Sequence, residues 1–564
     1  MIARHQNRRE WLFGIALLYF LGFSIAAASQ DVPKTTSTAA SGANADGYVG
    51  NQACAKCHAT IYESYMRSAM AHASGPAEEN LIAGEFTHKQ SGVYYVIFSD
   101  GGKVWLSFDR PDDPLVKGKR ELLYYIGEGR RGRTYLFSDD GFVFESPVNW
   151  YADRHMWDMA PAYGNVREIP LNLPALTSCL NCHVSGVRAP IDGTENKYAT
   201  PIFLFSGVTC ERCHGPGAAH VLGGAIVNPS KLSPKLRDQD CMQCHLEGNA
   251  AIERAGKHLY EYKPGADLAD YVRYFVLAGN VPQGLRATSQ FEALARSVCK
   301  QKSGDAMNCM SCHDPHQTVP REKRVAFYRA KCIACHGETF GAKHHRKQQD
   351  CTSCHMPPSP STDVAHTEVT DHRILRRPAR ENATQSPTAA LPELVPFPRT
   401  EEAAQEGREL ALAWQSMVDS GMTMAQPEAD GFLQAALRQF PDDPALLSAI
   451  AYSAQKRGDD NQARALYNRA LQQDATLIDA ATNLGVLEAN HGRTAEAVKL
   501  LQDAFERAPA RSEIGMNLAR IFCQTQQFET ARNSVRRVLR FNPDLGPAKK
   551  LLVELSANPP RCAP

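Results

Sequence analysis

Residues 210–220 read CERCHGPGAAH, and the first five letters of this stretch follow a pattern that recurs through the chain. Two residues separate two cysteines, and a histidine follows the second cysteine directly. The pattern C-x-x-C-H occurs seven times and uses 14 of the 17 cysteines. The motifs are Cys54/Cys57/His58, Cys179/Cys182/His183, Cys210/Cys213/His214, Cys241/Cys244/His245, Cys309/Cys312/His313, Cys332/Cys335/His336 and Cys351/Cys354/His355.

This spacing is the attachment signature of c-type haem. Each cysteine forms a thioether with one vinyl group of the porphyrin, and the histidine reaches the iron as its proximal axial ligand. Tetrahedral zinc sites and disulfides also use paired cysteines. Neither alternative requires a histidine directly after every second cysteine. The sequence therefore predicts seven covalently attached haem c groups.

The second axial ligand of each iron decides between electron transfer and substrate chemistry. The GPG turn after His214 reverses the chain and can direct His220 to an iron, that of a neighbouring haem rather than its own. The other candidates are Met70, His88, His316, His345, His366 and His372, with His72 and His344 as substitutes. These seven candidates match seven haems in a fully six-coordinate electron carrier. If one candidate fails, one iron is left open. His155 and His258 are interpreted as surface or supporting residues.

The 564-residue chain is too long for a single core, and its formal net charge of +1 does not favour nucleic acid as a partner. The N-terminus carries Arg4, Arg8 and Arg9, followed by an apolar run at residues 11–28. This pattern predicts a secretory signal over residues 1–30, or an N-terminal membrane anchor if the segment is not cleaved. Either alternative exports the rest of the chain.

Residues 48–378 are predicted to form a multihaem domain that is mainly α. A small antiparallel β insertion is expected at about 84–150, because two apolar alternations flank S-D-G-G and S-D-D-G turns. Six of the seven motifs lie between residues 179 and 355. This density predicts a core filled by porphyrins with short helices between them.

A proline-rich linker is predicted at 379–400, followed by a helical region at 401–558. In this region positions repeat every 34 residues, for example Ala463, Ala497 and Ala531. This period is typical of tetratricopeptide repeats, which stack into an α-solenoid and usually bind proteins or peptides. Simple capping or dimer packing is the alternative role.

The three cysteines outside the motifs are Cys299, Cys523 and Cys562. An odd, scattered set does not suggest a disulfide framework. Cys523 lies in a helical apolar pattern and is predicted to be a small core residue. Cys299 is expected to have a packing role, with a contact to a haem as the alternative, since it lies ten residues before a motif.

The chain resembles exported multihaem cytochromes c with C-terminal tetratricopeptide repeats. The haem region is similar to the tetrahaem cytochromes of nitrifying bacteria and to the pentahaem nitrite reductase group. The likeness covers about 48–558 and rests on NQACAKCHATIYESY, YYIGEGRRGRTYLF, CERCHGPGAAHV, CMQCHLEG, CMSCHDPH, CTSCHMPP and TDHRI. It implies haems with two axial ligands in stacked arrays. The wider group often has a distal histidine where this chain has Met70.

These observations predict a periplasmic or otherwise exported cytochrome that carries electrons between redox partner proteins and docks through its repeats. One alternative is an enzyme that acts on a small nitrogen or sulfur compound at a five-coordinate haem. Nitrite reductases of the resembling group often replace the motif histidine with lysine, and none of the seven motifs does so. Another alternative is a scaffold in which the haems are mainly structural.

Overall fold

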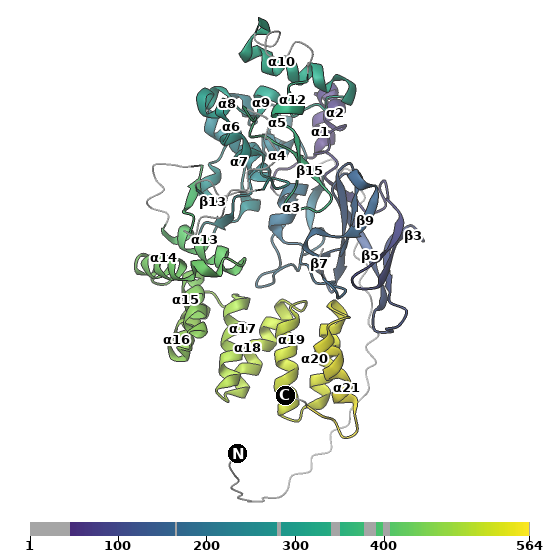
Figure 1. Cartoon of the computed structure of the whole chain (residues 1–564), viewed down its shortest axis with the longest axis vertical. Helices are drawn as coiled ribbons and strands as arrows, with labels where there is room; N and C mark the ends of the chain where they lie inside the picture. The colour runs from purple at the N-terminus through teal and green to yellow at the C-terminus, as the bar shows by residue number, and fades with distance from the viewer. Residues whose placement is uncertain are drawn as a thin grey trace, which may run out of the picture. The chain divides into compact units, whose positions relative to one another are not determined.

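The computed structural model describes residues 46–163, 166–278, 284–339, 350–376, 391–398 and 407–562. The predicted signal segment and the candidate ligand His345 lie outside these ranges. In Figure 1 two short purple helices, α1 and α2, come first, strands follow, further short helices come next, and green and yellow helices end the chain. No helix within the described ranges combines the length and the apolar character that crossing a membrane requires.

A nine-stranded antiparallel sheet forms the first part of the fold. Its order is β2-β3-β4-β5-β6-β8-β9, with β1 paired to β5 and β7 to β6. The strands are β1 (Ser74–Pro76), β2 (Gly84–His88), β3 (Val93–Asp100), β4 (Lys103–Asp109), β5 (Lys117–Ile126), β6 (Gly132–Asp139), β7 (Phe142–Glu145), β8 (Val148–Tyr151) and β9 (Met156–Met159). The predicted hairpins are confirmed as β3–β4 and as β5–β6–β7.

The prediction of a small insertion at about 84–150 is wrong in size, since the sheet spans residues 74–159. Strands β1 and β9 have only three and four residues. Such short strands are too brief for a period-two pattern to stand out in the sequence. The haem region therefore contains much more β structure than a mainly α fold class implies.

The sheet curls so that its two outer strands, β2 and β9, come into contact. Gly84 makes the close approach possible, because a Cβ atom there would lie 2.5 Å from Nε1 of Trp157. On β3 the apolar alternation points Val93, Tyr95 and Ile97 into the enclosed face, where each is at most 1% exposed. This face holds the main core of the haem region.

Short helices carry the haem motifs. They are α1 (Asn51–Ala55), α3 (Thr177–His183), α4 (Glu211–His214), α6 (Pro234–His245), α9 (Cys309–Cys312), α10 (Arg324–His336) and α12 (Thr352–His355). In the third motif the amide of His214 donates to the carbonyl of Cys210 at 3.0 Å, and His58 and Cys54 make the same bond at 2.9 Å. One helical turn thus places the two cysteines and the histidine of a motif on one face.

Other short elements connect the motif helices. The helices are α2 (Ala59–Tyr65), α5 (Ala218–Val221), α7 (Gln290–Ala295) and α8 (Val298–Ser303), and the strands are β10 (Val184–Val187), β11 (Phe203–Ser206), β12 (Ala250–Glu253), β13 (Val272–Leu277), β14 (Pro358–Pro360), β15 (Glu368–Thr370) and β16 (Leu394–Phe397). Strand β16 falls inside the predicted linker at 379–400, yet it pairs with β13 in a three-stranded sheet. The chain is thus ordered by pairing just before the helical region.

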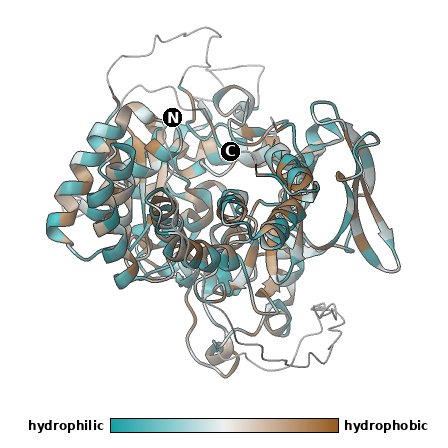
Figure 2. Cartoon of the chain, turned by 90° about the horizontal axis from the view of Figure 1, so that it is seen from below, coloured by the Kyte–Doolittle hydropathy of each residue, from teal (hydrophilic) through white to brown (hydrophobic). Residues whose placement is uncertain are grey.

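The C-terminal helices repeat as the sequence predicts. They are α13 (Gly407–Asp419), α14 (Gln426–Gln439), α15 (Pro444–Lys456), α16 (Asp460–Gln473), α17 (Ile478–Asn490), α18 (Thr494–Arg507), α19 (Ser512–Gln524), α20 (Phe528–Phe541) and α21 (Gly546–Ser556). Helices α15, α17, α19 and α21 begin at 444, 478, 512 and 546, a spacing of 34. Hydrophilic and hydrophobic residues lie on different faces of these helices (Figure 2). The buried faces form the solenoid core.

The last repeats share a core with the nine-stranded sheet. Phe541 at the end of α20 is 2% exposed, and its ring centre lies 5.3 Å from that of Phe144. Around this contact Nζ of Lys549 lies 2.5 Å from an Asp113 oxygen, and Arg110 donates to Asp544 at 2.9 Å. The repeats are therefore packed onto the haem region through apolar and ionic contacts.

Cys523 and Cys562 form a disulfide, which corrects the prediction that Cys523 is only a core residue. Cys523 is indeed 2% exposed in the core of the last repeats. Its partner comes from the C-terminal segment that follows α21. This pair has no local sequence signal, because the two residues are 39 positions apart with no motif around them.

Candidate haem sites

The first four motifs are connected by hydrogen bonds between their backbones and side chains. The amide of Cys210 donates to Oδ1 of Asn51, beside the first motif, at 2.8 Å. Arg212 of the third motif donates to the carbonyl of Asn181 in the second motif at 3.0 Å. Gln243 of the fourth motif donates to the carbonyl of Arg212 at 3.4 Å. The third motif is thus in contact with the other three.

Cysteines of different motifs also lie together. The thiol of Cys210 donates a hydrogen bond to Cys54, which lowers the pKa of Cys54 to about 7. The corresponding contacts elsewhere join Cys182 to Cys244, Cys241 to Cys309, and Cys332 to Cys351. Helix α10 also packs against α9 and α12. Each motif in the described region therefore has a neighbouring motif.

The predicted attachment cysteines differ in their exposure. Cys57, Cys179 and Cys335 are exposed. Cys354 is half-buried, and its sulfur accepts from the hydroxyl of the adjacent Ser353 at 3.9 Å. Helices α10 and α12, which carry Cys335 and Cys354, bury no residue of their own. The role of all fourteen motif cysteines in haem attachment stays a prediction from the motif.

Three motif histidines face a predicted distal histidine. The ring centres are 6.3 Å apart in His58 and His220, 6.0 Å in His214 and His316, and 6.3 Å in His313 and His372. The ring planes are inclined by 9°, 11° and 34° in the same order. In each pair the second histidine follows a different motif, as expected for His220.

These separations fit an iron between two imidazoles. A metal–nitrogen bond is about 2.0 Å and the nitrogen lies about 1.1 Å from the ring centre, so two imidazoles on one metal have centres about 6.2 Å apart. The donor set is also suitable, because two histidines are a common axial pair for an electron-transfer haem. The residues present therefore fit c-type haem.

In several of the predicted ligand histidines, a hydrogen bond at Nδ1 leaves Nε2 available to bind an iron. Nδ1 bonds a carbonyl oxygen in five cases: His214 to Val227 (2.8 Å), His220 to Gly224 (3.0 Å), His245 to Gln290 (3.2 Å), His355 to Leu375 (2.5 Å) and His372 to Thr370 (2.9 Å). A carbonyl can only accept, so Nδ1 carries the proton and Nε2 keeps its lone pair. A carbonyl oxygen is a usual hydrogen-bond acceptor for the ring nitrogen of a metal-bound histidine that does not bind the metal.

Burial favours the neutral form that a ligand needs. It is the largest cause that lowers the pKa of His214, His313 and His372, and a neighbouring histidine lowers each pKa further. Burial also lowers the pKa of His183 in the second motif. These imidazoles are therefore uncharged at neutral pH.

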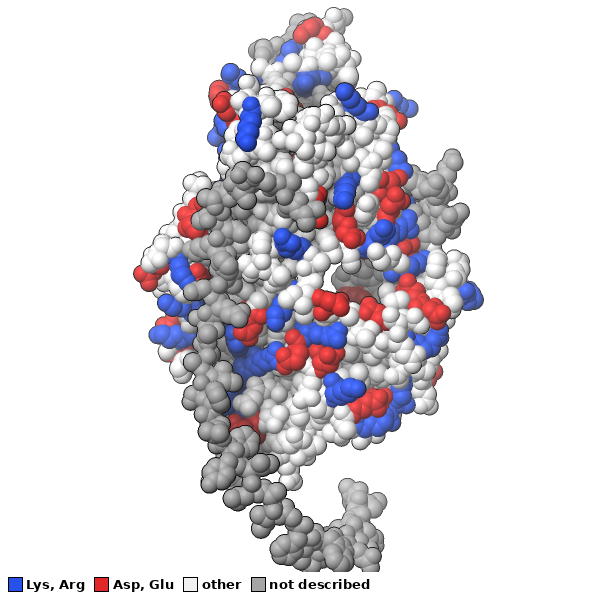
Figure 3. Space-filling model, turned by 180° about the vertical axis from the view of Figure 1, so that it is seen from behind, with Lys and Arg blue, Asp and Glu red and all other residues white. Residues whose placement is uncertain are grey.

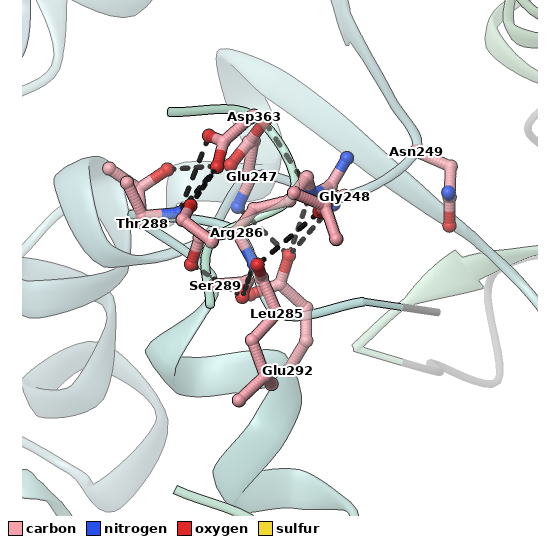
Figure 4. Close-up of polar contacts among 12 residues, drawn as sticks. Glu247, Gly248, Asn249, Leu285, Arg286, Thr288, Ser289, Glu292 and Asp363 are labelled. Carbon is pink, nitrogen blue, oxygen red and sulfur yellow. Dashed lines mark hydrogen bonds and ion pairs between the residues drawn. The ribbon is translucent and has the colours of Figure 1, made fainter. Parts of the chain in front are cut away.

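A polar network orients the segment after the fourth motif (Figure 4). The carboxylate of Glu292, 5% exposed, accepts from the amides of Gly248 at 2.6 Å and Glu247 at 3.0 Å. Arg286 forms ion pairs at 3.6 Å with Glu247 and with Glu292. Because Glu292 lies on α7 with the Gln290 that bonds His245, the network holds the helix that orients this histidine.

The remaining candidates are placed differently. Nε2 of His366 bonds Asp158 at 2.9 Å, and Nε2 of the substitute His72 bonds the Met66 carbonyl at 2.7 Å. His88 is buried at the end of β2, where its Nδ1 bonds Ser91 at 2.8 Å. Among the described residues, no motif histidine has a ring contact with His88 or His366.

Two further positions complete the predicted set. The carbonyl of Met70 accepts from the amide of Val208 at 2.9 Å, and its side chain is half-buried. His336 is exposed at the end of α10. Residues that the sequence analysis did not single out are the polar ones between the cysteines: Asn181, Glu211, Arg212 and Gln243 are all buried. Charged and polar residues at the unspecified positions of the motifs were the sequence feature that could have identified them.

Two family profiles match the chain. A profile described as "Cytochrome c554 and c-prime" matches residues 158–215, which contain the second and third motifs. A profile described as "Tetratricopeptide repeat" matches residues 490–555. The two matches fall in the two regions that the fold distinguishes.

Curated relatives and solved structures give partial matches. "Multiheme cytochrome MtrA" of Shewanella baltica (strain OS185) is 26% identical over 192 residues, 29% of this chain and 54% of that protein. "Dissimilatory sulfite reductase MccA" of Wolinella succinogenes is 26% identical over 187 residues, 27% of this chain and 22% of that protein. The chain thus spans about half the length of the first and a smaller share of the second.

Among solved structures, pilF of Pseudomonas aeruginosa is 22% identical with a TM-score of 0.25, covering 26% of this chain and 68% of that one. The cytochrome profile and the relative MtrA agree with the attachment motifs, and the tetratricopeptide profile agrees with the 34-residue helix spacing. The chain is a multihaem c-type cytochrome that carries C-terminal tetratricopeptide repeats.

Proposed function

We propose that the protein is an exported seven-haem cytochrome that carries electrons between redox partner proteins. The observation that supports this best is the set of three histidine pairs at 6.0–6.3 Å, each built from two motif segments. An iron with two histidine ligands changes oxidation state without binding substrate. When bound, haem supplies the one-electron chemistry.

The chain's own residues attach, orient and space the haems in this proposal. The paired cysteines of each motif hold the porphyrin, and the motif histidine is the proximal ligand. His220, His316 and His372 are the distal ligands of the first, third and fifth haems. The bonds from Nδ1 to carbonyl oxygens keep the imidazoles in the orientation that ligation needs.

Export and docking complete the proposal. Haem c is attached outside the cytoplasm, which agrees with the signal-like pattern of residues 1–30. The repeats are proposed to dock a redox partner, by faces other than the edge that packs on the sheet through Phe541. Acidic and basic side chains are interspersed on the face seen in Figure 3, which supports a protein partner rather than nucleic acid.

The alternative is an oxidoreductase that acts on a small nitrogen or sulfur compound at one five-coordinate haem. Two observations favour keeping it. His183 and His245 have no ring partner among the described histidines, and one relative is a sulfite reductase. The seven motifs all retain histidine.

Low-temperature electron paramagnetic resonance (EPR) of the oxidised protein tests the proposal, after a pyridine haemochrome assay has counted the haems. We expect seven haems, all low-spin. Fewer than seven haems would contradict the count. A substantial high-spin signal from intact protein would overturn the simple carrier and favour the enzyme, and binding of nitrite, hydroxylamine and sulfite would then be measured.

A further inference from the structure

We propose that Glu211, the first residue between the cysteines of the third motif, positions His220 opposite His58. The inference rests on the proposed function, because it assigns these two histidines to one haem. Haem attachment requires no particular residue at the two positions between the cysteines. Even so, Glu211 is 1% exposed, so its charge is held inside the protein.

The carboxylate of Glu211 accepts three backbone hydrogen bonds. The amide of Val49 donates to Oε1 at 2.9 Å, and the amide of Gly50 donates to Oε2 at 2.8 Å. The amide of Gly217 also donates to Oε1, at 2.8 Å. Bonds to a charged acceptor are stronger than neutral ones, and here they compensate the buried charge.

These three amides belong to the two segments that carry the paired histidines. Gly50 directly precedes helix α1, which begins the first motif and leads to His58. Gly217 directly precedes helix α5, which contains His220. One carboxylate therefore joins the starts of both helices. Beyond this carboxylate, the bond from Ala218 to the Gly47 carbonyl at 3.0 Å is a further link between the segments.

Close packing makes the arrangement specific. A Cβ atom at Gly217 would lie 3.0 Å from Cγ2 of Val49 and 3.2 Å from Oε1 of Glu211. His220 itself is exposed, and its ring hydrogen-bonds to Gly224 within the same loop. The ring therefore depends on the start of α5 for its place. Without the carboxylate, the amides beside it lose their acceptor, and the two segments separate.

The test uses the full-length protein with its haems attached, in the variants Glu211→Ala, Glu211→Gln and His220→Ala. Lys56→Gln is the matched control, because Lys56 is a charged residue between the cysteines of the first motif and is exposed. Haem content is measured by the pyridine haemochrome assay and the spin state by EPR. The wild-type protein provides the low-spin reference.

We expect Glu211→Ala to convert about one-seventh of the low-spin signal to high-spin, as His220→Ala does. Added imidazole restores the low-spin signal, which shows that an open sixth position caused the change. A double variant that combines Glu211→Ala with His220→Ala shows no more high-spin signal than His220→Ala alone. Glu211→Gln keeps one acceptor oxygen and gives a smaller conversion or a shifted low-spin signal, and Lys56→Gln matches the wild type.

Unchanged low-spin signals in Glu211→Ala with its full haem content would overturn the inference. If Glu211→Ala loses haem during maturation, Glu211→Gln decides: an altered signal supports the inference and an unaltered one overturns it. A wild-type protein without low-spin haem would instead contradict the proposed function. The two failures are therefore distinguishable.

Discussion

The helices of the repeat region and those of the haem region differ in how much apolar core their own side chains supply. In the repeats, α19 alone buries eight residues, and the small residues Ala463, Ala497 and Ala531 are fully buried at helix contacts. In the haem region, helices α9, α10 and α12 contain no fully buried residue. Their side chains supply little apolar core, so the attached porphyrins are expected to supply it. Side-chain periodicity identifies the repeat helices in the sequence, whereas the attachment motif identifies helices α9, α10 and α12.

The largest effect is expected at the contact between the two regions. Phe541→Ala removes a buried ring from the sheet core, and truncating a buried phenylalanine costs about 3–5 kcal/mol. We expect a lower thermal midpoint by far-ultraviolet circular dichroism and faster proteolysis between the sheet and the repeats. Phe440→Ala is the control, since that ring is 39% exposed. Equal midpoints for both variants would mean that the two regions fold independently.

The disulfide distinguishes the last repeat from the others. Closing a loop of 39 residues restricts the unfolded chain by about 4 kcal/mol in the entropic account, with about 2–4 kcal/mol typical in practice. Cys562→Ser is expected to lower the free energy of unfolding of the repeats by this amount, and therefore to lower the midpoint of their transition. Reductant should have the same effect on the wild type and none on the variant. A further shift of the variant in reductant would point to another cause.

Removing a distal histidine is expected to change the spin state of one haem without changing the stability of the fold. His220→Ala is expected to change the spin state of about one haem in seven with little change in the thermal midpoint, because the ring is exposed. His366→Ala is expected to leave every haem low-spin, since Nε2 of His366 bonds Asp158 instead. EPR of both variants checks this. A high-spin signal in His366→Ala would identify that residue as a ligand.

The sequence predicted the parts of the fold that have a period or a motif. The 34-residue spacing placed helices α15 to α21, and the alternation around the glycine turns predicted the hairpins. It missed β1 and β9, which are too short to show alternation, and the bond between Cys523 and Cys562, which has no local pattern. Tertiary contacts, not local residues, decide such features.

For the candidate site, the sequence named histidines but could not pair them. His220, His316 and His372 were candidates because they follow a motif or lie in a resembling stretch, and the ring distances now give each a partner. His88 was a candidate because it lies in the long gap after the first motif, and His366 because it follows the last motif. Their hydrogen bonds to Ser91 and Asp158 depend on the folded sheet and could not be read from the chain.

The smallest effect is expected from the ion pair between Asp113 on the sheet side and Lys549 on the repeat side. The hydrogen bond from Lys549 lowers the pKa of Asp113, so the carboxylate stabilises the fold above its unfolded pKa of about 4. This contribution is lost as the pH falls through the lower folded value.

Asp113→Asn is therefore expected to cost about 0.5–1 kcal/mol at pH 6, with a difference from wild type that vanishes in acid. Asp109→Asn, in an exposed pair with Lys117, should cost less at pH 6. Urea unfolding of all three proteins between pH 3 and 6, a range chosen to bracket the carboxylate titration, measures the difference. A constant cost across that range would show that the side chain acts through packing and not through its charge.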